Sequence, residues 1–480
     1  MKLIPIYWWN KEVHNFRVSQ DKFSKQPWAN GVILLLCVVV AMLLANLPFT
    51  KDIYHAVLET DLSMHIKSPE GADGVSRIDW VFPRGMTVEK FINDILMVIF
   101  FFNVGLEIKR EVICGELSSP KKAVMPVIAA FGGVVVPALI FTLINRGTLS
   151  ASGWGIPTAT DIAFAVGILS ILGDRVPVSL KVFLTALAIA DDLIAILVVA
   201  LFYGGKINLL LLGIALVVLA FVFLLNRLGE KRTEYYIFPL IIIWFLFYYS
   251  GIHATMSGVV MALLVPLQPR YNKAKFHRRS RILLEGLARS EEAAPDESFP
   301  NGPERYYLRR LSGLSKRSIG PAYRLEHILS PWVNFFIMPV FALANAGVEI
   351  TDLSYFNVFH FEAGIGAAGM GIFLGLLLGK PIGITLSSFL AIKCKVGEMP
   401  SGGTWPMLFA VACLGGIGFT MSIFVDTLSF GGPDVPAEVT SHLRDAGKIA
   451  VLMGSVCAGI LGSVLINLVH KIQSLRVTKQ

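Results

Sequence analysis

Long runs of apolar residues alternate with short polar stretches along most of the chain. A helix needs about 20 mostly apolar residues to cross a bilayer, and runs of this kind recur throughout the sequence. The pattern predicts twelve membrane-spanning helices, near residues 30–48, 91–107, 123–144, 156–172, 178–203, 207–226, 235–250, 252–267, 331–347, 364–382, 406–427 and 448–470. We therefore predict an all-α polytopic membrane protein whose two termini lie on the same side.

The composition agrees with this pattern. Of the 480 residues, 54% are hydrophobic and only 16% are charged, whereas a soluble domain has about 25% charged residues. The remaining loops are too short for a large soluble catalytic domain, so we expect neither an enzyme nor a cofactor. The five cysteines lie far apart without a metal-ligand spacing, which predicts neither a disulfide framework nor a zinc site.

The distribution of Lys and Arg predicts the orientation in the membrane. With the N-terminus inside, the inside segments hold 32 of these residues and the outside segments hold 9. Without the 13 in the long loop the count is still 19 against 9, and positive residues favour the cytoplasmic side. We expect a cytoplasmic N-terminus at 1–29, spans 1–8 within 30–267, a cytoplasmic loop at 268–327, spans 9–12 within 328–470 and a cytoplasmic tail at 471–480.

Two loops are long. The basic inside loop at 268–327 has an acidic, proline-containing centre that is typical of disorder, and we interpret it as a solvated linker. Alternatively, its basic residues attract anionic lipid headgroups. In the outside loop at 48–90, residues 75–82 and 86–88 are predicted to form a β-hairpin around Pro83.

Charges within the predicted spans are the main functional signal, because an ionisable group at the bilayer centre costs at least about 2.5 to 3.5 kcal/mol. The clear cases are Asp161, Asp191, Asp192 and Lys380, and we expect them to face a common interior. Three more, Asp94, His253 and Asp426, lie near predicted span ends. For these three we favour an interfacial position, with the polar group reaching water.

Two spans contain features that interrupt a regular helix. Pro157 is followed by Thr158, Thr160 and Asp161, and the eleventh span contains Gly415, Gly416 and Gly418. Interrupted helices in the two halves of a chain mark the binding site of many transporters. The alternative for the glycines is a close-packing helix face.

Asp191 and Asp192 lie in a stretch with no other charge. Neighbouring residues on a helix differ in direction by about 100°, so the two carboxylates must have different surroundings. One can face a cavity while the other faces Lys380, the one Lys or Arg that we count as intramembrane rather than as part of a loop or span end. The alternative is a buried ion pair without a transport role.

These stretches resemble the NhaA-type sodium/proton antiporters over nearly the whole chain. The resemblance rests on the motifs at 93–96, 104–111, 159–165, 188–192, 251–255, 324–327, 341–347, 379–381 and 416–420. It implies a core domain and an interface domain, with spans 3–5 and 10–12 as inverted repeats and with the broken spans 4 and 11 crossing at mid-membrane. It also implies a multi-pass protein of the bacterial inner membrane.

The resemblance assigns roles to the buried charges. Asp161 compensates the positive helix ends at the crossing, Lys380 compensates the negative ends, and Thr160 adds an oxygen nearby. Asp192 is the main carrier of Na⁺ and H⁺, while Asp191 pairs with Lys380 and also belongs to the ion site. The implied activity is electrogenic exchange of cytoplasmic Na⁺ or Li⁺ for external H⁺, driven by the proton gradient, for sodium and pH homeostasis.

Regulation and assembly follow from the same resemblance. Glu107, Glu111 and Glu326 match residues associated with activation at alkaline pH, and we add His327 and His253 as candidates for this response. Family members form homodimers through an outside hairpin. The insertion near 270–320, the longer first outside loop and Asp426 depart from shorter members.

Two other classes of protein fit the sequence less well. An intramembrane aspartyl protease has its two aspartates in Tyr-Asp and Gly-x-Gly-Asp contexts, which are absent around Asp161 and Asp191. A passive cation channel needs a pore-lining ring or filter, which does not suit an intramembrane lysine and two broken helices.

Overall fold

The computed structural model describes residues 28–67, 79–83, 85–205, 207–292, 300–350, 358, 365–430 and 436–477. Within these residues eight helices are long and apolar enough to cross a membrane, and two further pairs of helices each form one bent span. Two shorter apolar helices, α10 (Glu234–Ser250) and α11 (Met256–Leu264), cover the remaining predicted spans. The polytopic all-α class is confirmed, and helices occupy each of the twelve predicted segments.

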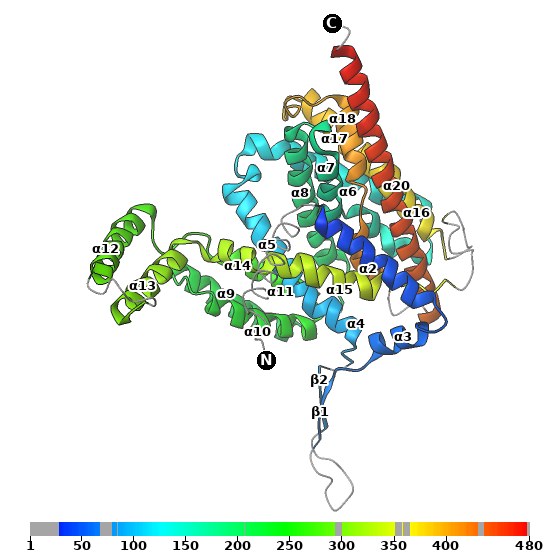
Figure 1. Ribbon diagram of the computed structural model, residues 1–480. Helices are drawn as coiled ribbons and strands as arrows, with labels where there is room; N and C mark the ends of the chain where they lie inside the picture. Colours follow the sequence, from blue (N-terminus) through cyan, green and yellow to red (C-terminus); the bar gives the residue numbers. More distant parts are fainter. Residues whose placement is uncertain are drawn as a thin grey trace, which may run out of the picture. The chain divides into compact units, whose positions relative to one another are not determined.

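The chain forms two compact units, and most of their α-helices are labelled in Figure 1. The first unit comprises Met1–Met97, Glu111–Gly205 and Pro331–Gln480, and the second comprises Val98–Arg110 and Lys206–Ser330. Two helices, α5 and α14, contain residues of both units. The helices of the first unit, including these two, are α2 (Ala29–Asn46), α3 (Lys51–Glu59), α4 (Val88–Phe91), η1 (Ile92–Leu96), α5 (Met97–Cys114), η2 (Glu116–Ser118), α6 (Pro120–Ile144), η3 (Leu149–Thr158), α7 (Ile162–Leu172), η4 (Gly173–Arg175), α8 (Val178–Phe202), α14 (Pro321–Trp332), η5 (Val333–Ile337), α15 (Met338–Asn345), α16 (Ala368–Leu374), η7 (Gly375–Gly379), α17 (Lys380–Lys393), α18 (Trp405–Leu414), α19 (Phe419–Ser429) and α20 (Ala437–Val477).

In the first unit, α6 and α17 pack against each other through glycines. A Cβ atom on Gly132 would overlap the carbonyl oxygen of Gly383, and a Cβ atom on Gly383 would overlap that of Gly132. Small residues allow membrane helices to approach this closely. The contact holds α17, whose first residue is Lys380, against α6.

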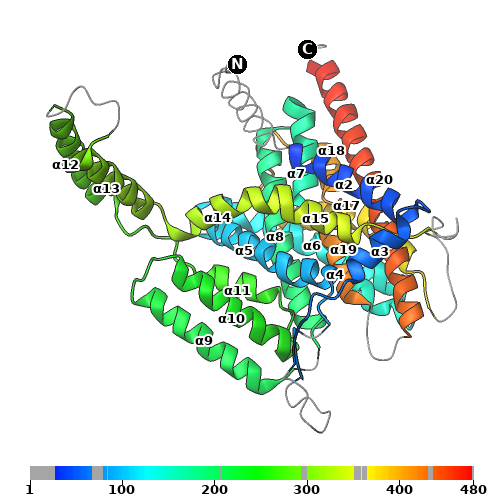
Figure 2. The same ribbon diagram turned by 60° about the horizontal axis from the view of Figure 1, so that its bottom comes forward.

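The second unit contains α9 (Leu209–Arg227), α10, α11, α12 (Lys273–Glu292) and α13 (Gly302–Ser318). Figure 2 shows α9, α10 and α11 side by side. The buried residues of its hydrophobic cluster are Phe102, Leu106, Ala215, Val222, Tyr236, Ile243, Leu246, Phe247, Met261, Ala262, Val265, Ala322 and Leu325. At the C-terminal end of α11, the Lys109 ammonium group donates hydrogen bonds to the carbonyl oxygens of Leu263, at 2.8 Å, and Val265.

A hydrogen bond connects the short helix α3 to the end of α15. The Tyr54 hydroxyl donates a hydrogen bond to the carbonyl oxygen of Leu343 at 2.8 Å. Burial raises the pKa of Tyr54 to about 12, so the hydroxyl keeps its proton at neutral pH. Lys51 adds an ion pair with Glu349.

The β-hairpin differs from the predicted one. Strand β1 (Met64–Lys67) pairs antiparallel with β2 (Asp79–Phe82), with Met64 opposite Phe82. The predicted pairing of 75–82 with 86–88 is therefore wrong, and residues 75–78 lie outside the described residues. Pro83 cannot donate to a ladder and follows the end of β2. Val88 instead begins α4, where the Thr87 hydroxyl accepts a hydrogen bond from the Lys90 N–H at 3.3 Å.

The segment predicted as a solvated linker contains two helices, α12 and α13, which lie side by side in both views (Figures 1 and 2). A capping box begins α13, because Asn301 and Glu304 each accept a hydrogen bond from the other's N–H at 3.0 Å. The acidic centre at 293–299 lies outside the described residues. The helix that contains the ninth predicted span begins at Pro321, before the predicted residue 331, because the polar first turns of α14 continue directly into the apolar helix.

Candidate functional site

The first predicted break is present between η3 and α7, which are bent by 40°. Pro157 lies in the last turn of η3 and has no N–H to continue a helix. The Thr158 hydroxyl closes this turn by donating to the carbonyl oxygen of Gly155 at 2.6 Å. Asp161 then caps α7, its Oδ1 atom accepting a hydrogen bond from the Phe164 N–H at 3.3 Å.

The second predicted break separates α18 from α19, which are bent by 54°. Its glycines are needed for close contacts. A Cβ atom on Gly416 would overlap the carbonyl oxygen of Leu376, and one on Gly418 would overlap the Ser422 hydroxyl. The structure therefore unites the two interpretations of these glycines, since they both interrupt the helix and allow it to pack closely.

Asp161 forms hydrogen bonds between the two breaks, and we call the place where the two breaks meet the crossing. Its backbone N–H donates to the carbonyl oxygen of Ile417 at 2.7 Å, and its Oδ2 atom accepts hydrogen bonds from the hydroxyl and the N–H of Thr420, the latter at 3.2 Å. The carboxyl group thus lies at the first turns of both α7 and α19. A negative charge is favourable at such helix ends, as expected of a group that compensates the helix dipoles.

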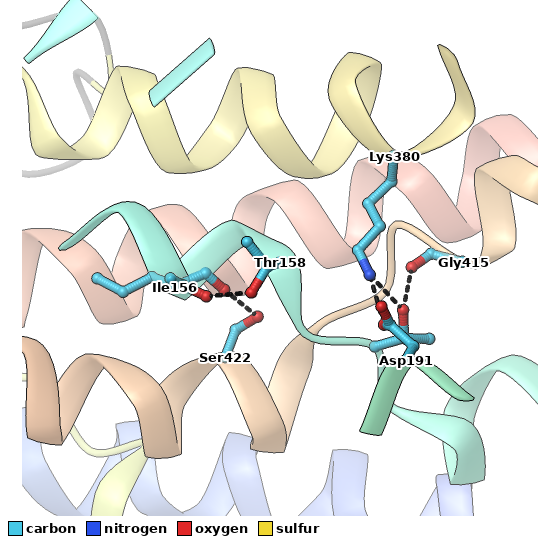
Figure 3. Close-up of polar contacts among 8 residues, drawn as sticks. Ile156, Thr158, Asp191, Lys380, Gly415 and Ser422 are labelled. Atoms are coloured by element: carbon cyan, nitrogen blue, oxygen red, sulfur yellow. Dashed lines mark hydrogen bonds and ion pairs between the residues drawn. The ribbon is translucent and has the colours of Figure 1, made fainter. Parts of the chain in front are cut away.

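Lys380 contacts the other side of the crossing (Figure 3). Its Nζ atom donates to Asp191 Oδ2 at 2.5 Å and to the Thr160 hydroxyl at 2.8 Å. Thr160 in turn donates to the carbonyl oxygen of Gly415 at 2.8 Å, where α18 ends. The side chains of Lys380 and Asp191 are both 0% exposed, so this ion pair is held away from solvent.

Asp192 follows Asp191 on α8 and is only 3% exposed. Lys380 also interacts electrostatically with Asp192. If Asp191, Asp192 and Lys380 are all ionised, two carboxylates share one ammonium group, which leaves a net negative charge in a region of low dielectric. A proton or a small cation that takes oxygen ligands would relieve this imbalance. The arrangement can therefore bind either one.

The candidates for the pH response lie elsewhere in the fold. Glu326 accepts a hydrogen bond from Arg110 Nε at 3.0 Å within the second unit, while Glu111 accepts one from the N–H of Glu116 at 3.0 Å within the first. His327 stacks on Tyr323, with ring centroids 6.3 Å apart. Glu107 lies on α5 and His253 lies in the turn before α11.

Sequence reasoning missed two residues near the crossing. Thr420 bonds to Asp161 across a separation of 259 residues, and the only signal was its place at the end of the Gly-Ile-Gly-Phe-Thr motif. Asp426 was predicted to be interfacial, but its side chain is buried with 0% exposure, so that prediction is wrong. The reason is tertiary, because α20 covers the face of α19 that carries Asp426.

Comparisons with known proteins agree with this geometry. The family model described as Na⁺/H⁺ antiporter 1 matches residues 21–466. Similar proteins include the Na(+)/H(+) antiporter NhaA of Oleidesulfovibrio alaskensis, 40% identical over 92% of this chain and 91% of the relative. Others are NhaA 2 of Helicobacter hepaticus, 40% identical over 95% and 97%, and NhaA of Escherichia coli O1:K1, 37% identical over 92% and 96%.

The family match covers both broken spans, the paired aspartates and the lysine, so the resemblance drawn from the motifs is confirmed. This chain belongs to the Na⁺/H⁺ antiporter 1 family.

Proposed function

We propose that this chain exchanges Na⁺ for H⁺ across a membrane at the crossing of its two broken spans. The observation that carries this proposal is the buried group formed by Asp191, Asp192, Thr160 and Lys380, in which one ammonium group faces two adjacent carboxylates. The family and the names of its members support the two cargo ions.

Asp192 is the main carrier in this proposal. Its carboxylate holds either a proton or Na⁺, so the two ions compete for one group. Asp191 is held by Lys380 and takes part when that ion pair opens. Thr160 supplies a further oxygen, while Asp161 stabilises the two helix ends that make the crossing.

The exchange is electrogenic, with more protons entering than cations leaving, and it extrudes Na⁺ or Li⁺ at the expense of the proton gradient. The protein lies in the bacterial inner membrane with both termini in the cytoplasm, where it serves sodium and pH homeostasis. Alternating access follows from movement of the inverted-repeat helices against the remaining ones. Glu107, Glu111, Glu326, His327 and His253 contribute to activation at alkaline pH.

Anionic lipids and a second copy of the chain are the expected partners. In the second unit, a cavity of about 640 Å³ is lined by six basic side chains, namely those of Lys231, Arg232, Arg270, Lys316, Arg317 and Arg324. Such clusters attract anionic headgroups. The strands β1 and β2 supply the outside hairpin for a homodimer.

Ion-coupled flux in proteoliposomes tests the proposed function. Adding NaCl or LiCl to vesicles that hold a proton gradient should collapse that gradient, and KCl should serve as the control. The collapse should change with membrane potential if the exchange is electrogenic. Single-channel currents in a planar bilayer without coupled proton movement would instead identify a passive channel and contradict the proposal.

A further inference from the structure

Asp426 is a buried acidic residue that the crossing does not use. It lies on α19 with 0% exposure, and neither of its carboxylate oxygens has a hydrogen-bond partner among the residues that the structure describes. A buried polar group is normally hydrogen-bonded, and each exception needs a physical explanation. An unsatisfied carboxyl group inside a membrane helix indicates a function other than stability.

The position of Asp426 links it to the crossing. It follows Thr420, which bonds to Asp161, by six residues on the same helix, a rise of about 9 Å at 1.5 Å per residue. α20 approaches this carboxyl group with a glycine, because a Cβ atom on Gly447 would overlap Asp426 Oδ1. The contact keeps the carboxylate enclosed between α19 and α20.

Among the described residues, the titratable groups that interact with Asp426 lie on α20 and directly after α8. α20 supplies Lys448, Arg444 and Asp445, and Tyr203 follows the end of α8. Arg444 also donates to the carbonyl oxygen of Phe430, at 3.0 and 2.6 Å. Two further described helices, η3 and α15, pack on α19, and neither carries an acidic or basic residue.

These groups continue towards solvent along α20. His442, Asp445 and Lys448 are spaced three residues apart, which places them on one face of the helix. His442 is exposed, whereas Asp445 and Lys448 are half-buried. His55 of α3 and Glu349 also interact with Asp445. Titratable side chains therefore extend from the surface of α20 towards the buried carboxylate of Asp426.

We propose that Asp426 is a second proton-binding site of the transport cycle, loaded from the outer face along His442, Asp445 and Lys448. The inference rests on the proposed exchange function and on the orientation that the Lys and Arg count predicts. A hydronium ion of the outer water gives up a proton, so that one of its O–H bonds breaks while an O–H bond forms on an Asp426 oxygen. That bond breaks in turn when the proton moves on to a carboxylate at the crossing, where a new O–H bond forms.

Infrared spectroscopy of the full-length protein tests proton binding directly. A pH-difference spectrum should contain carbonyl bands of protonated carboxylic acids, and Asp426→Asn should remove one of them while Asp192→Asn leaves that one in place. Asp52→Asn, which alters an exposed carboxylate on α3, is the matched control and should leave the band in place. A spectrum of Asp426→Asn identical to that of the wild type would overturn the proposal.

Flux in proteoliposomes tests the role in transport. Asp426→Asn should lose most of the Na⁺-coupled proton flux while calorimetry still records wild-type Na⁺ binding. Its melting temperature should not fall, because the substitution removes an unsatisfied buried charge. His442→Gln, at an exposed position that does not endanger folding, should shift the dependence of flux on outer pH.

The outcomes separate this inference from the proposed function. Wild-type flux and an unshifted pH dependence in both Asp426→Asn and His442→Gln would overturn the inference alone. Loss of Na⁺ binding in Asp426→Asn would also overturn it, because Asp426 would then act through the crossing itself. If the wild type moved no protons on addition of Na⁺, the proposed function would fail, while the infrared band would still report whether Asp426 binds a proton.

Discussion

The two units bury different kinds of side chain. Around the crossing in the first unit, Asp161, Asp191, Asp192 and Lys380 are all at most 3% exposed. The cluster that fills the second unit is made of apolar residues and one tyrosine, Tyr236, whose hydroxyl donates to the carbonyl oxygen of Glu230 at 2.8 Å.

The difference shows that the first unit buries charges that cost stability and serve ion binding. Removing charges from water costs several kcal/mol per ion, and a buried ion pair often gains less than well-packed apolar residues would. The first unit keeps its charges because an exchanger needs groups that hold a cation or a proton. The second unit has no such requirement at its core, where packing alone decides which residues fit.

Asp192→Asn should have the largest effect. Asparagine keeps the size and one oxygen ligand but removes the charge and the exchangeable proton. We expect Na⁺-coupled proton flux to fall to background while the protein remains folded, which flux assays and gel filtration on the same preparation would show.

Asp191→Asn is the control for this prediction, because it removes the partner of Lys380 and leaves Asp192 intact. It should retain measurable Na⁺ binding and show altered exchange and lower stability. If Asp191→Asn abolishes Na⁺ binding while Asp192→Asn binds normally, the two roles are reversed.

Lys380→Ala should mainly reduce stability. It leaves Asp191 buried without its cation and the carboxyl end of α18 without compensation. Breaking a buried pair by removing one partner costs about 3 to 5 kcal/mol, which thermal unfolding in detergent would detect. The double variant Asp191→Asn, Lys380→Gln should recover part of the loss. Equal melting temperatures for wild type, single and double variants would contradict a stabilising pair.

Ile243→Val should have a smaller effect in the second unit. Ile243 is fully buried in the apolar cluster, and deleting one methyl group there costs about 0.5 to 1.5 kcal/mol. The melting temperature should fall slightly while the Na⁺ affinity stays at the wild-type value. A changed affinity would mean that the second unit contributes to the ion site.

Deletion of residues 285–303 should have the smallest effect. It removes the end of α12 and the beginning of α13, whose described side chains are mostly exposed. Maximal flux should be unchanged, and a shifted pH dependence would agree with a regulatory role of this basic segment. Loss of all flux from a correctly inserted, stable deletion variant would show that the hairpin is needed for transport.

The helices were predictable because each span must bury an apolar stretch of fixed minimal length. Both breaks were also predictable, since Pro157 and the cluster at Gly415, Gly416 and Gly418 weaken a helix through local chemistry. The hairpin register was not predictable, because the paired residues Met64 and Phe82 lie far apart in the chain. Likewise, the burial of Asp426 depends on Gly447 of another helix.

The roles of Asp191 and Asp192 could be separated from sequence only in part. Helix geometry required that their surroundings differ, but the identity of the aspartate that faces Lys380 came from the family resemblance. In the structure Lys380 bonds to Asp191, and the role of Asp192 as the main carrier stays a prediction.

Calorimetric titration of the purified wild-type protein with Na⁺ at a series of pH values tests the central claim most directly. Competition between Na⁺ and one proton predicts that the apparent affinity weakens by about tenfold per pH unit below the pKa of the carboxylate, with protons released on binding. An Na⁺ affinity that is the same at every pH, with no proton release, would contradict exchange by competition at this site.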